Sequence, residues 1–233
     1  MSKVIFLSHI LDENTPSYGN RNKFLIEKKS DIQKGDVAND SFIKTTVHIG
    51  THIDMPYHFF ENGQTIEDFP ADFWLFSKEE ILFLDLKIDK EKLIIRDELI
   101  DRLEQIKKKS QFSILNYKLL MVKTGISDIR EEDRFWTENF GFHPDIYDYL
   151  VENFPNIRVF GFDSISVASF SNRIIGREAH KRFLNPENPI LLLEDMNLRY
   201  IDENIVFKEI IIAPFRISKC DGLPCTIIGK IND

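Results

Sequence analysis

The segment TTVHIGTHIDMPYHF, residues 45–59, gathers ligand-type side chains in a stretch without lysine or arginine. It holds three of the chain's six histidines, His48, His52 and His58, together with Asp54. Neutral imidazole and carboxylate are the usual ligands for zinc, manganese and iron. An exposed strand face could carry the same groups for solubility alone, but four of them in so short a stretch favour a metal site.

The backbone of this segment has to bend if those side chains are to meet. The β-branched residues before it and Gly50 at its centre disfavour a helix, so we expect a strand. In a straight strand the Cα atoms of His48 and His52 would be about 13 Å apart. Glycine can adopt backbone angles closed to other residues, and Pro56 blocks the continuation of a central strand. We therefore predict a turn at Gly50 that brings His48, His52 and Asp54 to one point.

The number of ions and the route of the proton stay open at this level. Asp54 has two oxygens and could bridge a second ion, since paired ions lie about 3.5–4 Å apart in such sites. His58 stands beyond the proline and is either a further ligand or a free base, because an imidazole exchanges protons near neutral pH.

The rest of the chain predicts an α/β fold with a mixed β-sheet flanked by helices. Residues 96–108 and 143–154 have apolar side chains at helical spacing, and several strands follow one another without a helix, notably near the C-terminus. We take residues 1–233 as one domain and the polar, aromatic stretch 125–142 as a lid or a flexible loop. The predicted strands are 4–7, 45–49, 81–86, 118–124, 157–163, 189–194, 205–215 and 226–231.

Composition narrows the classes of function. The chain has 233 residues, 42% of them apolar, which is enough for a sizeable core. Its formal net charge of -8 argues against nucleic-acid binding, which usually needs a basic patch. We find neither an apolar run of roughly 20 residues that could cross a bilayer nor a secretory signal, and we expect a cytoplasmic protein without a membrane partner. Cys220 and Cys225 are expected to be reduced thiols.

Residues 48–58, HIGTHIDMPYH, resemble the HxGTHxDxPxH signature of the metal-dependent cyclase superfamily, which includes bacterial kynurenine formamidases and isatin hydrolases. Seven fixed positions in eleven residues make this signature specific. The resemblance implies a swivelling β/β/α-type domain. The further segments similar to the family are FLSHILDENTPSY (6–18), KTG (123–125), FHP (142–144), GFDSIS (161–166), PILLLEDM (189–196), APF (213–215) and DGLP (221–224).

The resemblance also implies roles for individual residues. In formamidase-like members, two histidines and the aspartate of the signature bind metal, and a later histidine and glutamate complete a second position that shares the aspartate. The third histidine, here His58, donates and accepts protons, and an aromatic residue near the start, here Tyr18, contacts substrate. Phe59 and Phe60 could line an apolar pocket or pack in the core. The implied metal ligands are His48, His52, Asp54, His180 and Glu194.

The residues themselves support the last two ligands unequally. Glu194 ends the apolar run PILLLE, and a carboxylate at the edge of a buried strand is costly unless it is paired or bound to metal. His180 lies in the helical pattern GREAHKRFL and, taken alone, would be read as a surface histidine.

Three positions depart from the family pattern. Asp195 replaces the asparagine of an EN pair, Val167 stands where aspartate is frequent, and Thr226 stands where arginine is usual. These substitutions avoid the implied metal ligands, so we expect them to change the groups that support those ligands or that contact substrate.

Together these features predict a metal-dependent hydrolase of an amide-type C–N bond, in an arylformamide such as N-formylkynurenine or in a related cyclic amide. One or two divalent ions, zinc or manganese, would acidify a bound water and stabilise the oxyanion, and His58 would carry the proton to the leaving nitrogen. The alternatives are a cyclase or lactone hydrolase at the same site, and a protein that binds metal without turnover. The resemblance further implies a small-molecule substrate and a homo-oligomer, either a dimer or a tetramer.

Overall fold

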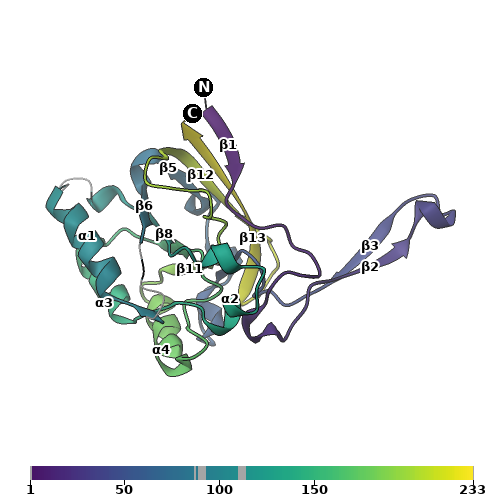
Figure 1. Cartoon of the computed structure of the whole chain (residues 1–233), viewed down its shortest axis with the longest axis horizontal. Coiled ribbons are helices and arrows are strands. Elements are labelled where there is room, and N and C mark those ends of the chain that lie inside the picture. Colours follow the sequence, from purple (N-terminus) through teal and green to yellow (C-terminus); the bar gives the residue numbers. More distant parts are fainter. Residues whose placement is uncertain (1, 87, 89–92, 110–113, 233) are drawn as a thin grey trace.

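The computed structural model describes residues 2–86, 88, 93–109 and 114–232. Its main sheet contains β1 (Ser2–Phe6), β4 (His52–Asp54), β5 (Leu75–Ser77), β6 (Ile81–Asp85), β8 (Leu119–Lys123), β10 (Val159–Phe162), β11 (Leu191–Glu194), β12 (Phe207–Pro214) and β13 (Gly222–Asn232). The strand order is β5-β12-β13-β4-β11-β10-β8-β6, with β1 added beside β13 (Figure 1). The predicted α/β fold with a mixed sheet is confirmed.

Helices α1 (Asp97–Lys109), α3 (Asp145–Asn153) and α4 (Arg173–Phe183) flank the sheet on the side of its parallel strands (Figure 1). The short helix α2 (Arg134–Thr137) lies apart from these three and contacts the 3-10 turns at residues 18–20 and 126–129. In α1 the buried Leu99 and Leu103 form the apolar stripe. Three lysines stand in its last turn, where the negative end of the helix dipole stabilises positive charge. The rings of Tyr147 and Phe183, 5.6 Å apart between centroids, join α3 to α4.

Of the parallel strands, β8, β10 and β11 are buried on both faces, whereas β6 at the edge of the sheet is buried on one face and half-buried on the other. Along β8, Leu120 and Val122 contribute to the core under the helices, whereas Leu119 and Met121 contribute to a second core on the opposite face. Such double burial explains the continuous apolar runs of these strands, since side chains alternate between two apolar layers.

Strand β4 joins the two halves of the sheet. It pairs antiparallel with β11 on one side and antiparallel with β13 on the other. β13 pairs in turn with β12 and with β1, which brings the two ends of the chain together (Figure 1). A strand of three residues therefore sits where the parallel half meets the antiparallel half.

Two smaller strand pairs complete the fold. β2 (Leu25–Ser30) and β3 (Asp40–Lys44) form a hairpin that projects away from the body of the molecule (Figure 1). β7 (Ile94–Ile95) pairs with β9 (Gly141–Phe142). Within the described ranges, no helix combines the length and the apolar character that crossing a membrane requires.

Two local predictions are wrong. Residues 45–49 do not form a strand, because Gly50 takes a left-handed φ of 56° and the strand begins only after it, at His52. The stretch 125–142, expected to be a lid or a flexible loop, instead folds into η8 (Ile126–Ile129), α2 and the whole of β9. Its aromatic residues Phe135 and Phe140 are buried in the core under the helices, and this packing fixes the segment. Cys220 and Cys225 are both free cysteines in the structure.

Candidate metal centre and active site

Two neighbouring strands position the buried acidic and imidazole groups. Glu194 of β11 pairs directly with His52 of β4, and Asp54 follows two residues later. Residues opposite each other on an antiparallel pair share one face of the sheet, whereas Ile53 points to the opposite face and its apolar core. His52, Asp54 and Glu194 therefore stand together on the face covered by helices, and all three are buried.

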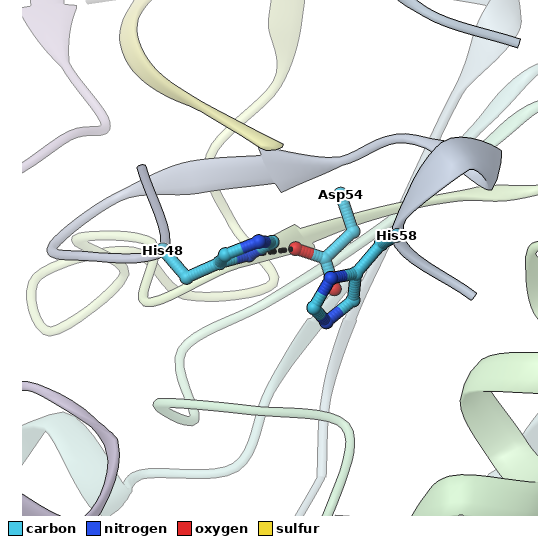
Figure 2. Close-up of side chains that lie close together, drawn as sticks. All are labelled: His48, Asp54 and His58. Carbon is cyan, nitrogen blue, oxygen red and sulfur yellow. Dashed lines mark hydrogen bonds and ion pairs between the residues drawn. The ribbon is translucent and has the colours of Figure 1, made fainter. Parts of the chain in front are cut away.

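The turn at Gly50 brings His48 back to the same point. The ring centroids of His48 and His52 are 5.4 Å apart, and His48 Nδ1 lies 2.8 Å from Asp54 Oδ1 (Figure 2). Gly222 of β13 permits this approach, because a Cβ at that position would lie 2.5 Å from the His48 ring. Figure 2 shows His48 and His58 converging on the Asp54 carboxylate.

Two other imidazoles are fixed in the tautomer of a metal ligand. Nδ1 of His52 and Nδ1 of His180 each lie 2.8 Å from a backbone carbonyl oxygen. A carbonyl oxygen only accepts, so each Nδ1 carries the proton and each Nε2 has a free lone pair. His52 Nε2 is 3.4 Å from both Asp54 and Glu194, and His180 Nε2 is 3.5 Å from Asp54. Carbonyl-held histidines of this kind are typical of metal sites.

His48 faces carboxylates through both ring nitrogens. Its Nδ1 meets Asp54, and its Nε2 lies 2.8 Å from Asp221 Oδ2. Burial favours the neutral ring, but the charges and hydrogen bonds of the two carboxylates outweigh it and raise the pKa of His48 to about 10. The imidazolium thus balances the acidic groups here, and a divalent ion bound to His48 would have to displace its proton.

The two buried carboxyl groups respond to their surroundings in opposite directions. Burial disfavours the charged form of both. For Asp54 the positive charge of His48 and the hydrogen bond from that ring outweigh burial, and its pKa is well below the usual range. For Glu194 burial and the negative charge of Asp54 hold the pKa well above the usual range. A cation between the two carboxylates would favour ionisation of both.

The donor atoms fall into two groups that share Asp54. Those of His48, Asp54 and His58 lie within 4.8 Å of one another, and so do those of His52, Asp54 and Glu194. A carboxylate common to both groups suits the bridging position between two ions. Imidazole and carboxylate without thiolate are donors that fit zinc or manganese.

Asp221 is a site residue that the sequence-based reasoning missed. Its Oδ2 lies 3.1 Å from His58 Nδ1 as well as 2.8 Å from His48 Nε2. Hydrogen bonds from His48 and His58 hold the pKa of Asp221 far below its usual range. Since an ionised carboxylate only accepts, His58 carries a proton on Nδ1 and leaves Nε2 free. The only signal was the segment DGLP, and its proximity to the histidines depends on the pairing of β13 with β4.

Asp195, which stands where the family pattern has asparagine, forms an ion pair with Arg130. Arg130 donates to the Asp195 carboxylate at 2.8 Å through Nε and at 2.6 Å through Nη2. The carboxylate is fully buried, and the Thr51 hydroxyl donates to the backbone carbonyl of Asp195 at 2.6 Å. Arg130 belongs to the stretch expected to be a lid, so that stretch braces the backbone next to Glu194 and His52 instead.

The other two departures differ in their distance from the site. The backbone N–H of Val167 donates to Glu194 Oε1 at 2.7 Å. This contact uses the main chain, so it does not require the aspartate that is frequent at that position. Thr226 is exposed on β13 and lines a different hollow of the surface.

A cavity of about 360 Å³ lies against these groups. Tyr18 lines its wall in η1 (Tyr18–Asn20), and its ring meets Phe170 edge-on with centroids 5.6 Å apart. Phe59 lines the cavity and stacks on His180 at 4.8 Å, whereas Phe60 packs against the core under the helices. The seven residues that the sequence analysis singled out as ligands, base and substrate contact all line this one cavity.

Known proteins resemble this chain over nearly its whole length. The Cyclase family model matches residues 5–169. Cyclase-like protein 3 of Oryza sativa subsp. japonica is 26% identical over 97% of this chain and 79% of its own length. Kynurenine formamidase of Bacillus cereus (strain ATCC 10987 / NRS 248) is 25% identical over 96% of this chain and 95% of its own length. Isatin hydrolase A from Labrenzia aggregata shares the fold, with a TM-score of 0.77, 19% identity and coverage of 100% and 94% of the two chains.

Proposed function

We propose that this chain, which belongs to the Cyclase family, is a metal-dependent hydrolase that cleaves an amide-type C–N bond in a small molecule. The family match and the kynurenine formamidase among its relatives support a hydrolase at the level of the family. The proposed substrate class is an arylformamide such as N-formylkynurenine, or a related cyclic amide.

One observation carries the proposal: ring nitrogens of three histidines, His48, His52 and His180, lie within 3.5 Å of the buried Asp54 carboxylate. Such a concentration of imidazole and carboxylate donors in a cavity is chemically suited to a divalent cation. When bound, the cation polarises a carbonyl group and acidifies a water molecule. The residues proposed to hold it are His48, His52, Asp54, His180 and Glu194.

His58 is proposed to move the proton. It lines the cavity and is half-buried, and its Nδ1 hydrogen bond to Asp221 leaves Nε2 as the basic nitrogen. His58 would take a proton from the attacking water at Nε2 and pass it to the nitrogen that leaves. Asp221 would orient the ring and fix its tautomer, which is the role of the carboxylate in many histidine-based sites.

The test measures metal content and turnover together. Protein loaded with Zn²⁺ or Mn²⁺ is assayed for release of the aromatic amine from N-formylkynurenine and from formanilide, with and without chelator. His58→Ala should lower kcat by about 10²–10⁴-fold and keep the metal, whereas His180→Ala should lower the metal content. His143→Ala is the matched control, because His143 pairs with Asp145 outside the cavity.

Each alternative gives a different result. Bound metal without turnover of formamides, isatin, imides or esters would indicate a protein that binds metal only. Turnover of lactones or esters alone would indicate a lactone hydrolase or a cyclase at the same site. Loss of metal in His58→Ala would make His58 a ligand. A homo-oligomer, a single domain over residues 1–233 and a cytoplasmic location stay predictions, and light scattering of the purified protein tests the first.

A further inference from the structure

Three arginines line the cavity and have no part in the proposed bond cleavage. Arg21 follows η1, and Arg173 and Arg177 lie in the first half of α4. All three are exposed. Arg173, Arg177 and His180 are spaced at i, i+4 and i+7, which places them on one stripe of the helix. The helix face that delivers His180 to the site therefore also presents two guanidinium groups to the cavity.

These three guanidinium groups have no carboxylate partner in the described ranges of the chain, although the chain has a net charge of -8. Ion pairs join carboxylates to Arg96, Arg102, Arg130, Arg134, Arg182 and Arg199 instead. Arg173 is also the first residue of α4, where the helix dipole disfavours a cation. Ion pairing with carboxylates therefore does not account for the placement of these three cations, and helix stability does not account for that of Arg173.

Aromatic side chains pack against two of these arginines, Arg173 and Arg21. The Arg173 guanidinium stands over the Phe170 ring, 4.2 Å from its centroid. A Cβ at Gly19 would lie 3.3 Å from Arg21 Nε and 3.4 Å from Phe170, so Arg21 packs near the same ring from a separate segment. Tyr18 meets Phe170 edge-on and lines the cavity. The wall thus offers an apolar surface for a ring next to positive charge for an anion.

We propose that Arg21, Arg173 and Arg177 bind a carboxylate group of the substrate, so that the enzyme prefers acidic aromatic amides to neutral ones. This inference rests on the proposed hydrolytic function. A guanidinium presents a planar pair of N–H donors that matches a carboxylate. The guanidinium charge also offsets the repulsion that the ionised Asp54 at the base of the cavity exerts on an incoming anion.

The test compares substrates that share one scissile bond. The three isomers of formamidobenzoate carry a carboxylate at different ring positions, and formanilide carries none. We expect the best isomer to exceed formanilide in kcat/KM by roughly tenfold to a hundredfold, as for hydrogen bonds to charged groups. The double variant Arg173→Gln/Arg177→Gln should reduce that ratio at least tenfold. Arg182→Gln is the matched control on the same helix, because Arg182 pairs with Asp148 outside the cavity, and it should leave the ratio unchanged.

Binding separates this inference from the proposed reaction. If no formamide is turned over, calorimetry with each formamidobenzoate and with formanilide still measures the preference for the anion and its loss in the double variant. A preference that disappears in the double variant supports the carboxylate site even without turnover. Equal kcat/KM and equal affinity for all four compounds, or a preference that the double variant retains, would overturn it. If inorganic phosphate competed with formamidobenzoate at least tenfold more strongly than benzoate does, the site would be a phosphate site and the proposed carboxylate ligand would be wrong.

Discussion

The bend at Gly50 can be tested by adding one methyl group. Gly50 has φ of 56°, and an L-residue in this left-handed region loses roughly 1–2 kcal/mol. For a chain of this size that corresponds to a fall in Tm of about 2–8 °C. The new Cβ would also lie 2.3 Å from Leu11 Cδ2, the far end of a side chain that can move. Gly50→Ala should therefore fold, with a displaced turn between His48 and His52.

Gly50→Ala should reduce catalytic activity more strongly than it reduces the stability of the fold. Misplacing a reacting group by about 1 Å costs about a hundredfold in rate, so we expect kcat/KM to fall by that order in Gly50→Ala. Gly35→Ala is the matched control, because Gly35 has φ of 95° in the hairpin and a Cβ there would meet nothing within 4 Å. In Gly35→Ala the Tm should fall by a similar amount and the activity should stay unchanged. Leu11→Ala combined with Gly50→Ala should recover part of the lost stability by removing the contact.

Thermal unfolding in the presence of chelator gives the Tm values, and the amine-release assay gives kcat/KM. The reasoning is refuted if Gly50→Ala and Gly35→Ala lose equal stability and Gly50→Ala keeps wild-type kcat/KM. That result would mean that the turn at residue 50 does not set the position of His48 relative to His52.

Three further predictions concern other parts of the molecule. Asp195→Asn should lower the free energy of unfolding by about 3 kcal/mol in urea denaturation, because it leaves the buried Arg130 guanidinium without a counter-charge; an unchanged midpoint would contradict this. Burial raises the pKa of both thiols, and Cys225 is more completely buried than Cys220. Iodoacetamide at pH 8 should therefore alkylate Cys220 first. Equal alkylation rates in fragment-ion mass spectrometry would contradict this order. Zn²⁺ at about 100 times its Kd should stabilise the protein by about 2.7 kcal/mol, and Glu194→Gln should remove most of that gain; a full gain in the variant would show that Glu194 is not a ligand.

The parts of the site that the sequence could predict are those where local chemistry and local geometry coincide. The ligand-type residues around Gly50 are close in sequence, and the incompatibility of a straight strand with shared ligation required a turn there. The structure has that turn. The apolar runs, with helical segments between some of them, likewise predicted an α/β fold with a mixed sheet, because doubly buried strands need continuous apolar sequence.

The contacts that the sequence could not predict depend on tertiary pairing. Asp221 reaches His58 from 163 residues away, through the register of β13 on β4. Arg130 finds Asp195 because a polar and aromatic stretch folds against the core, and such a stretch has no periodicity from which to infer this. His180 appeared to be a surface residue because a helical pattern does not reveal which neighbour covers it.

The register of β4 makes assembly of the pocket and correct pairing of the sheet a single event. A shift of one residue would turn Ile53 into the cavity and push the two polar side chains beside it into hydrocarbon. Burying a carboxylate and an imidazole there without partners would be prohibitive. Chains with a shifted β4 should therefore be too unstable to remain folded, and native-like molecules with the wrong strand register should not accumulate.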